Sequence, residues 1–253
     1  MAVFAHPDDE GQIAGLMAKY ASEGTEVSLV SATRGGLGST NNPSLLEGKT
    51  MAQLRANELR CVCKVLGVRN LRFLSYKEGS FHLADSAQAI GKISEIIGGL
   101  APQIIITFGP EGVYGHRDHI AISRLTTTAF HAARQNNLLH GLRIPLKLYY
   151  TAYPRSLFDR LRTQGIEFGI EVEGAVHRIE GVYDEKITTV IDVSGFRPQK
   201  SAAFRCHRSQ LRPGDFRWMI IEGKLMELLA TERLVRVFPP VTESAEIERD
   251  LFE

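Results

Sequence analysis

The amino-acid sequence predicts an α/β fold: a Rossmann-like, mostly parallel sheet of strand order 3-2-1-4-5 with flanking helices. Short apolar runs alternate with longer segments of helical spacing through residues 1–153, which is the pattern of repeated strand–helix–strand units. The apolar run at 103–108 (QIIITF) is typical of a strand buried in the middle of a parallel sheet. We therefore expect one domain over 1–253, with a Rossmann-like core at 1–153 and a mixed extension at 154–253.

The elements are expected in the following order. In the core, we expect strands at 2–5, 25–33, 68–76, 103–108 and 147–153, and helices at 10–24, 45–66, 85–99 and 118–136. Gly24 and Gly67 are expected to end the first two helices, because glycine is the usual residue just past a helix. In the extension, we expect helices at 156–164, 197–210 and 216–230, and strands at 187–193 and 234–238. The first strand is so short that the native start is expected a few residues upstream.

Composition excludes several classes of protein. The chain has 253 residues, 43% of them hydrophobic and 23% charged, as in an ordinary globular protein. A net charge of +1 gives no electrostatic footprint for nucleic acid or for a membrane surface. No apolar run has the length of a membrane span. Three cysteines, Cys61, Cys63 and Cys206, cannot build a disulfide framework, so we expect a reducing cytosol and a cytoplasmic protein.

Two polar segments contain most of the candidate chemistry. His6-Pro7-Asp8-Asp9 follows the first strand, and His116-Arg117-Asp118-His119 follows the fourth. In a sheet of order 3-2-1-4 these strands are neighbours, and their carboxyl ends open at the switch point where ligands bind. Either motif alone is weak, since histidine and aspartate are common in turns and helix caps. Together, at adjacent strand ends, they predict a site.

The residue types in this site fit a catalytic metal. Zinc in enzymes is held by three nitrogen or oxygen ligands and keeps one position for water. We expect His6, Asp9 and His119 to be these ligands. The same set also accepts Fe²⁺, and the sequence does not decide between the two metals.

The remaining polar residues of the two motifs fit proton transfer. Asp8 would lie beside the metal as the general base, and His116 on the opposite side would stabilise an oxyanion and protonate a leaving amine. Asp118 would hold the His116 ring in one tautomer.

The two motifs resemble the signature motifs of the LmbE-like, or PIG-L, deacetylase family. Weaker likenesses extend the resemblance over residues 2–210: Thr33-Arg34-Gly35-Gly36, Arg55 with Glu58-Leu59, Gly112-Val113-Tyr114-Gly115, and Lys200 with His207-Arg208-Ser209-Gln210. The resemblance implies the same metal ligands and general base as the residues do. It further implies that Tyr114 is a mobile residue near the scissile carbonyl and that Arg34 and Arg55 contact the substrate. Gly36-Leu37 stands where the family often has an acidic residue.

Family members remove N-acetyl groups from glucosamine conjugates, so the resemblance implies a zinc-dependent N-deacetylase with a small amino-sugar substrate. An amidase acting on a thiol conjugate of the same sugar is the related alternative. From other classes, we considered a nucleotide-binding Rossmann protein and a non-catalytic metal or carbohydrate-binding protein. The Gly-rich segment 34–38 lacks the dinucleotide fingerprint, which disfavours the first. A structural metal site would need neither Asp8 nor His116, which disfavours the second. The sequence leaves a homo-oligomer open.

Overall fold

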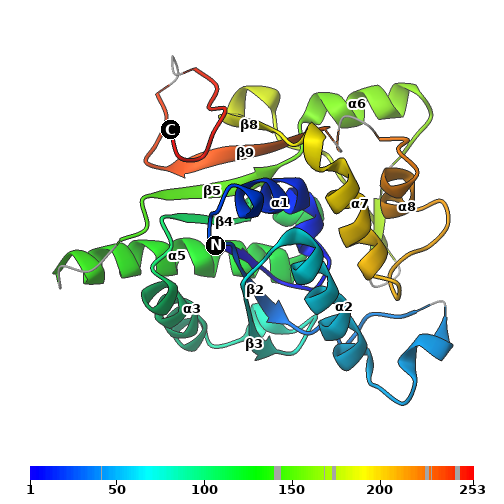
Figure 1. The fold of residues 1–253 in the computed structure, drawn as a ribbon, viewed down its shortest axis with the longest axis horizontal. Coiled ribbons are helices and arrows are strands. Elements are labelled where there is room, and N and C mark those ends of the chain that lie inside the picture. The colour runs from blue at the N-terminus through cyan, green and yellow to red at the C-terminus, as the bar shows by residue number, and fades with distance from the viewer. Residues whose placement is uncertain are drawn as a thin grey trace. The chain divides into compact units, whose positions relative to one another are not determined.

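The computed structural model describes residues 1–40, 42–139, 144–167, 169–172, 175–225, 228, 230–242 and 246–253. Over these residues, seven strands form a sheet of order β3-β2-β1-β4-β5-β9-β8, and β6 and β7 form a separate pair (Figure 1). The predicted order 3-2-1-4-5 is therefore confirmed. The two strands expected in the extension, β8 and β9, continue the same sheet beyond β5.

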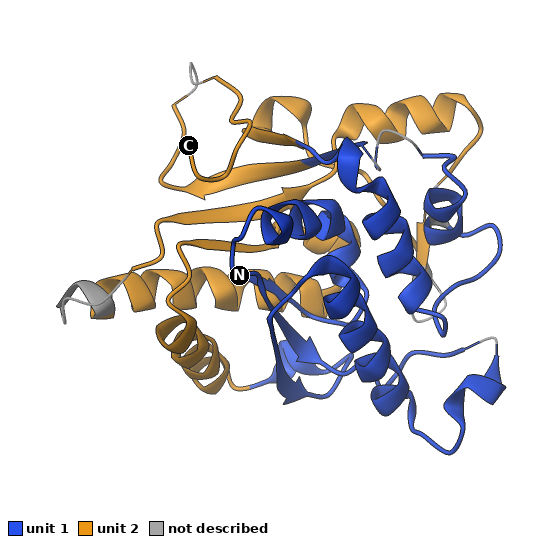
Figure 2. Ribbon diagram, in the orientation of Figure 1, with its two compact units in different colours: residues 1–84, 192–232 blue, residues 85–191, 233–253 orange. Residues whose placement is uncertain are grey.

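The chain forms two compact units (Figure 2). Unit 1 contains residues 1–84 and 192–232, and unit 2 contains residues 85–191 and 233–253. Each unit therefore takes residues from both the expected core and the expected extension.

Unit 1 contains the first three strands: β1 (Ala2–Phe4), β2 (Ser28–Thr33) and β3 (Asn70–Tyr76). All three run parallel, with Val3 opposite Val30 and Val30 opposite Arg72. Every residue of β1 and β2 is buried, as expected for inner strands covered on both faces. The helices of this unit are η1 (Asp9–Ile13), α1 (Ala14–Ser22), η2 (Pro43–Leu46), α2 (Met51–Leu66), η3 (Phe81–Leu83), η5 (Ser194–Phe196), α7 (Arg197–Cys206) and α8 (Phe216–Ile221).

The helix expected at 45–66 begins six residues later, at Met51. Glu47 and Gly48 adopt left-handed backbone angles, which end the short 3-10 turn η2. Thr50 then caps α2, and a reciprocal capping box with Gln53 satisfies two backbone donors. Gly67 ends the helix with φ 72°, as predicted. The later start of α2 follows from the capping box, which the apolar spacing of 45–66 does not reveal.

Helix α1 is capped by a residue that is distant in sequence. Its own N-cap, Ile13, has no side chain that can accept a hydrogen bond. The buried Glu232 carboxylate accepts the backbone N–H of Gly15 at 2.9 Å and that of Leu16 at 2.7 Å. Lys200 of α7 forms a buried ion pair with the same carboxylate. These contacts fix the start of α1, which η1 connects to the His6–Asp9 loop.

Unit 2 contains the parallel pair β4 (Ile104–Phe108) and β5 (Lys147–Ala152). It also contains β9 (Thr231–Phe238) from Arg233 onward, which runs antiparallel to β5. Its other elements are α3 (Ser86–Leu100), α4 (Gly112–Gly115), α5 (Arg117–Leu139), α6 (Arg155–Thr163), β6 (Gly169–Val172), β7 (Ala175–Arg178), η4 (Asp184–Lys186) and, up to Ile191, β8 (Thr189–Asp192). The β6–β7 pair was not predicted, because each strand has only four residues, the shortest length at which alternation indicates a strand. Of the helix expected at 216–230, α8 forms the first part, while 226, 227 and 229 lie outside the described residues.

The structure contradicts the prediction for the cysteines. Cys61 of α2 and Cys206 at the end of α7 form a disulfide with a Cα–Cα distance of 5.8 Å, and Cys63 is a buried free thiol. The pairing joins residues 145 positions apart, so only the packing of α2 against α7 reveals it. The disulfide removes the basis on which we expected a reducing compartment. Among the described residues, no helix has the length and apolarity needed to cross a membrane.

Candidate functional site

The first motif forms a tight loop at the carboxyl end of β1. The backbone N–H of His6 donates to Asp9 Oδ2 at 2.7 Å, and the same oxygen lies 3.6 Å from His6 Nδ1. His6 is buried, with 6% of its surface exposed. The predicted ligands His6 and Asp9 are therefore held side by side by the turn itself.

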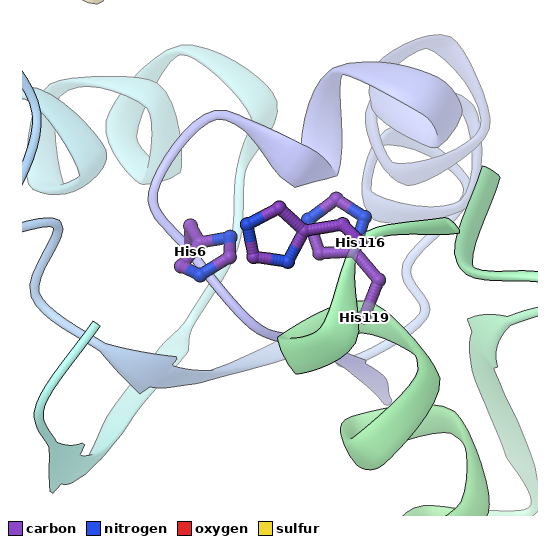
Figure 3. A group of neighbouring side chains, drawn as sticks. All are labelled: His6, His116 and His119. Carbon is purple, nitrogen blue, oxygen red and sulfur yellow. The ribbon is translucent and has the colours of Figure 1, made fainter. Parts of the chain in front are cut away.

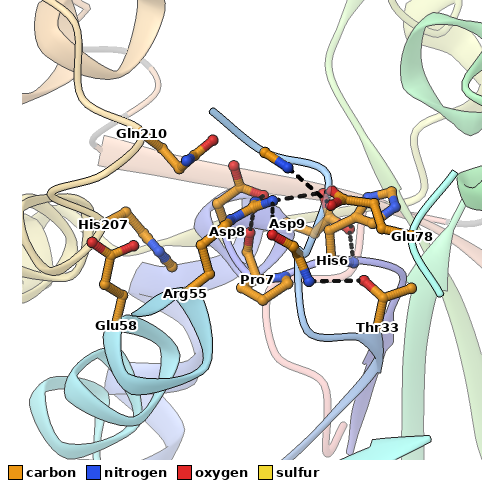
Figure 4. A network of polar contacts seen from close by, with 12 residues as sticks. His6, Pro7, Asp8, Asp9, Thr33, Arg55, Glu58, Glu78, His207 and Gln210 are labelled. Carbon is orange, nitrogen blue, oxygen red and sulfur yellow. Dashed lines mark hydrogen bonds and ion pairs between the residues drawn. The ribbon is translucent and has the colours of Figure 1, made fainter. Parts of the chain in front are cut away.

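Asp8 has an unusual backbone conformation that its neighbours stabilise. Its φ is 107°, a value that costs energy for any residue with a Cβ. Glu10 Oε2 accepts the Asp8 N–H at 2.9 Å. The Asp8 carboxylate lies between two guanidinium groups: Oδ1 is 3.2 Å from Arg55 Nη2, and Oδ2 is 2.5 Å from Arg217 Nη2. These contacts fix the carboxylate in one orientation; several of these residues are drawn in Figure 4.

Arg55 is at the centre of this polar network. Its guanidinium donates to the carbonyl of Pro7 and to that of Gly35, and pairs with Glu78 at 3.0 Å (Figure 4). Only 3% of Arg55 is exposed. The structure thus places Arg55 behind Asp8 as a support for the loop, and its predicted contact with substrate stays a prediction.

Two further buried contacts connect the first motif and α2 to the segment after α7. His207 Nε2 lies 2.6 Å from Glu10 Oε1, so that its N–H donates to the same carboxylate that holds Asp8. Glu58 of α2 accepts the backbone N–H and the hydroxyl of Ser209, both at 2.7 Å. Through Glu10, the segment after α7 supports the loop that contains Asp8.

The second motif lies at the start of α5 in unit 2. Ser123 Oγ donates to the carbonyl of Phe108 at 2.7 Å, which fixes α5 at the end of β4. His119 is buried, and its ring stacks on Phe108 with centroids 4.2 Å apart. His119 Nδ1 lies 3.2 Å from the carbonyl of Gly112. Because a carbonyl only accepts, Nδ1 carries the proton, and Nε2 is left with the lone pair that a metal needs.

His116 lies next to His119, with ring centroids 4.5 Å apart. Its Nδ1 accepts the backbone N–H of Asp118 at 3.1 Å, so the proton of the neutral ring is on Nε2. Asp118 is fully buried, and this hydrogen bond is made by its backbone N–H rather than by its carboxylate. The backbone N–H of Asp118 thus fixes the tautomer, and the role expected for the Asp118 carboxylate stays a prediction.

The Tyr114 ring lies edge-on to both histidine rings, with its centroid 5.8 Å from that of His116 and 5.4 Å from that of His119. It belongs to α4, a single distorted turn in which Val113 has φ 71°. Left-handed angles are rare for a β-branched residue, and such strain is concentrated at functional sites.

Among the described residues, His6, His116 and His119 form a group that could hold a metal ion. One ring nitrogen of each lies within 4.8 Å of the others (Figure 3). This group differs from the predicted ligands by one residue, because it contains His116 in place of Asp9.

Comparison with known proteins extends this picture. Residues 1–130 match the family model described as PIG-L: GlcNAc-PI de-N-acetylase. The chain is also 33% identical to the 1D-myo-inositol 2-acetamido-2-deoxy-alpha-D-glucopyranoside deacetylase of Streptomyces scabiei, over 100% of this chain and 88% of the relative. The chain belongs to the PIG-L family. The family prediction made from the two motifs is confirmed.

Solved structures share the PIG-L fold of this chain. GalB, the 4-carboxy-2-hydroxymuconate hydratase from Pseudomonas putida KT2440, has a TM-score of 0.68 at 17% identity, covering 96% of this chain and 98% of GalB. The N,N'-diacetylchitobiose deacetylase from Pyrococcus horikoshii has a TM-score of 0.64 at 19% identity, covering 93% of this chain and 82% of that one. At these identities the likeness establishes the fold alone.

The sequence did not reveal four residues that this site uses. Glu10, Glu78, Arg217 and Glu232 hold Asp8, Arg55 and the start of α1 through contacts that span up to 217 positions. Glu10 alone gave a signal, because it directly follows the first motif.

Proposed function

We propose that this PIG-L protein is a zinc-dependent hydrolase that removes the N-acetyl group from an N-acetylglucosamine conjugate. The observation that carries the proposal is the group of three histidines, in which the neutral His119 tautomer has its ring lone pair on Nε2. The carboxylates of Asp8 and Asp9 lie in the same loop as His6.

The donor set fits zinc. Imidazole nitrogen and carboxylate oxygen are its usual ligands in hydrolases. We propose His6, Asp9 and His119 as the ligands, because Asp9 is held against His6 and because His116 Nε2 carries a proton in the neutral tautomer. A zinc ion held there would polarise the amide carbonyl and lower the pKa of water. Fe²⁺ fits the same donors, so metal content has to be measured.

The proton transfers are assigned to Asp8 and His116. The Asp8 side chain lies between Arg55 and Arg217, and we assign it the role of taking a proton from water. His116 presents its Nε2–H, which can donate to the developing oxyanion and then to the leaving nitrogen. Tyr114, edge-on to the His116 ring, is the residue we propose to lie nearest the substrate carbonyl.

The substrate class follows from the relatives. The Streptomyces scabiei relative is named for an acetamido-deoxyglucopyranoside of myo-inositol. We propose a small amino-sugar conjugate of this kind, and an amidase acting on a thiol conjugate would use the same residues.

Metal content tests the ligand assignment. We expect the purified protein to contain about one equivalent of zinc, and His6→Ala, Asp9→Ala and His119→Ala to lose it. His116→Ala should retain zinc, because we assign that ring to proton transfer. Zinc lost from His116→Ala but retained in Asp9→Ala would replace this assignment with a three-histidine site.

Acetate release from a panel of N-acetylglucosaminides, with and without chelator, tests the activity. We expect Asp8→Asn to keep its zinc and to lose about 10²–10⁴-fold in kcat, the usual contribution of a general base. Asp159→Asn on the exposed face of α6 is the matched control and should be fully active. An Asp8→Asn variant with wild-type turnover would remove Asp8 from the mechanism. Absence of acetate from every substrate, with zinc bound, would contradict the deacetylase itself.

A further inference from the structure

A hollow of about 410 Å³ lies along one face of α2. From the helix, Ala52, Gln53, Ala56, Asn57 and Arg60 line it, at the i, i+1, i+4, i+5 and i+8 spacing of a single helix face. Arg34, from the loop after β2, and Lys49, just before α2, complete the wall. Hereafter we call it the α2 hollow. It lies entirely within unit 1.

The α2 hollow is distinct from the network around Asp8. Arg55, on another face of α2, points to Asp8 and Pro7 and does not line the hollow. The loop of Gly35 and Gly36 lies between the two: Gly35 accepts a hydrogen bond from Arg55, whereas a Cβ on Gly36 would be 3.6 Å from Ala52. Arg34 is therefore next in sequence to Gly35, which contacts Arg55, but its own side chain lines the α2 hollow.

The positive charge of the hollow is only weakly compensated. Three of its seven lining residues are cationic and none is acidic. Lys49 pairs with Glu47, but that carboxylate is 73% exposed, so the pair is weak. Arg60 donates to the amide oxygen of Asn57 at 2.7 Å, which neutralises no charge.

Arg34 gives the strongest indication of a ligand. Its side chain makes no hydrogen bond or ion pair with another described residue. Instead, its guanidinium stacks on the Phe73 ring at 4.2 Å, and Arg60 lies 5.9 Å from the same ring. Stacking orders a guanidinium while leaving its N–H groups available in the plane, which is the geometry that binds carboxylate or phosphate by two parallel bonds.

We propose that the α2 hollow binds a small molecule bearing a phosphate or carboxylate group, through Arg34, Arg60 and Lys49. The volume falls in the range of about 300–1,000 Å³ that is typical of ligand sites, larger than a lone oxyanion requires. The methyl groups of Ala52 and Ala56 provide an apolar wall for the body of the molecule. The anionic group belongs either to the aglycone of the amino-sugar substrate or to a free metabolite; only the first source rests on the proposed function.

Direct binding tests the site without any turnover. Isothermal titration would use inorganic phosphate, N-acetylglucosamine 6-phosphate and uncharged N-acetylglucosamine. We expect at least one of the two anions to bind, with an affinity that falls as salt rises. Arg34→Met and Arg60→Met should each weaken it by at least 10-fold, because both keep the apolar stem and remove the charge. Arg72→Met, an exposed arginine of β3 outside the hollow, is the control and should bind as wild type.

Thermal unfolding of each variant confirms that it is folded. Absence of binding by both anions, or binding unchanged in Arg34→Met and Arg60→Met, would overturn the proposal. A kinetic comparison then identifies the source. If the substrate's charged end occupies the hollow, Arg34→Met raises KM for anionic N-acetylglucosaminides at least 10-fold more than for neutral ones. If a free metabolite occupies it, Arg34→Met still weakens anion binding, but KM changes equally for anionic and neutral N-acetylglucosaminides.

Discussion

Replacement of Lys200 by methionine should destabilise unit 1 far more than the loss of an ordinary ion pair. Lys200 Nζ donates to the Leu228 carbonyl at 2.8 Å and pairs with Glu232, and both charged side chains are buried. Methionine fills most of the lysine stem but leaves the Glu232 carboxylate without its cation.

The size of the effect follows from what remains around that carboxylate. Breaking a buried pair by removing one partner costs about 3–5 kcal/mol, because an uncompensated charge stays buried. Glu232 keeps the backbone N–H groups of Gly15 and Leu16 at the positive end of α1, so we expect the lower end, about 3 kcal/mol. The exposed pair of Lys19 and Glu23, one helical turn apart, is the matched control, and Lys19→Met should cost below about 0.5 kcal/mol.

Urea unfolding followed by circular dichroism measures these differences. Adding Glu232→Gln to Lys200→Met should restore part of the lost stability, because glutamine still accepts a backbone N–H and carries no charge. The two single losses should then exceed the double loss by at least about 1 kcal/mol. A Lys200→Met variant within about 0.5 kcal/mol of wild type would refute the reasoning, as would equal effects at Lys200 and Lys19.

Two further predictions concern the cysteines and the loop beside Arg55. Burial, and next the charge of Glu10, raise the pKa of the Cys63 thiol to about 12, so the native protein should not react with iodoacetamide at pH 8. Mass spectrometry should find one alkylated cysteine in the denatured protein, and three when the denatured protein is also reduced. Three alkylated cysteines in the denatured protein without reductant would exclude the disulfide. Gly35→Ala should lower deacetylation more than 10-fold, since its Cβ would lie 2.6 Å from Arg55 Nη1 at φ +71°. Gly214→Ala is the control: Gly214 has φ +85° and open space around it, so this variant has the backbone strain of about 1–2 kcal/mol without a clash. Equal deacetylation by the Gly35→Ala and Gly214→Ala variants would contradict the role of Arg55 as a support.

The sequence predicted what depends on local pattern and on strand order. Both motifs are contiguous, and each follows an apolar strand, so the sheet order was enough to expect His6 and His119 in one site. The start of α2 was wrong by six residues, because a capping box at Thr50 outweighs helical spacing at 45–50.

Partners that only tertiary structure brings together could not be predicted. Arg217 reaches Asp8 across 209 positions, and Cys61 reaches Cys206 across 145. No spacing rule relates such residues. The supporting role of Arg55 could not be predicted for a similar reason. Its spacing from Glu58 is that of an ordinary ion pair on one helix, but Arg55 bonds to Pro7 and Glu58 bonds to Ser209.

The Cys61–Cys206 bond gives unit 1 a second covalent connection. Its two segments, 1–84 and 192–232, are joined along the backbone only through residues 85–191 of unit 2. The sulfur bridge joins them again outside that path, which makes the chain a closed ring from 61 to 206. A protease that cuts once within 85–191 would therefore open the ring without releasing a fragment. The nicked protein would keep both halves of unit 1 attached until a reductant separates them.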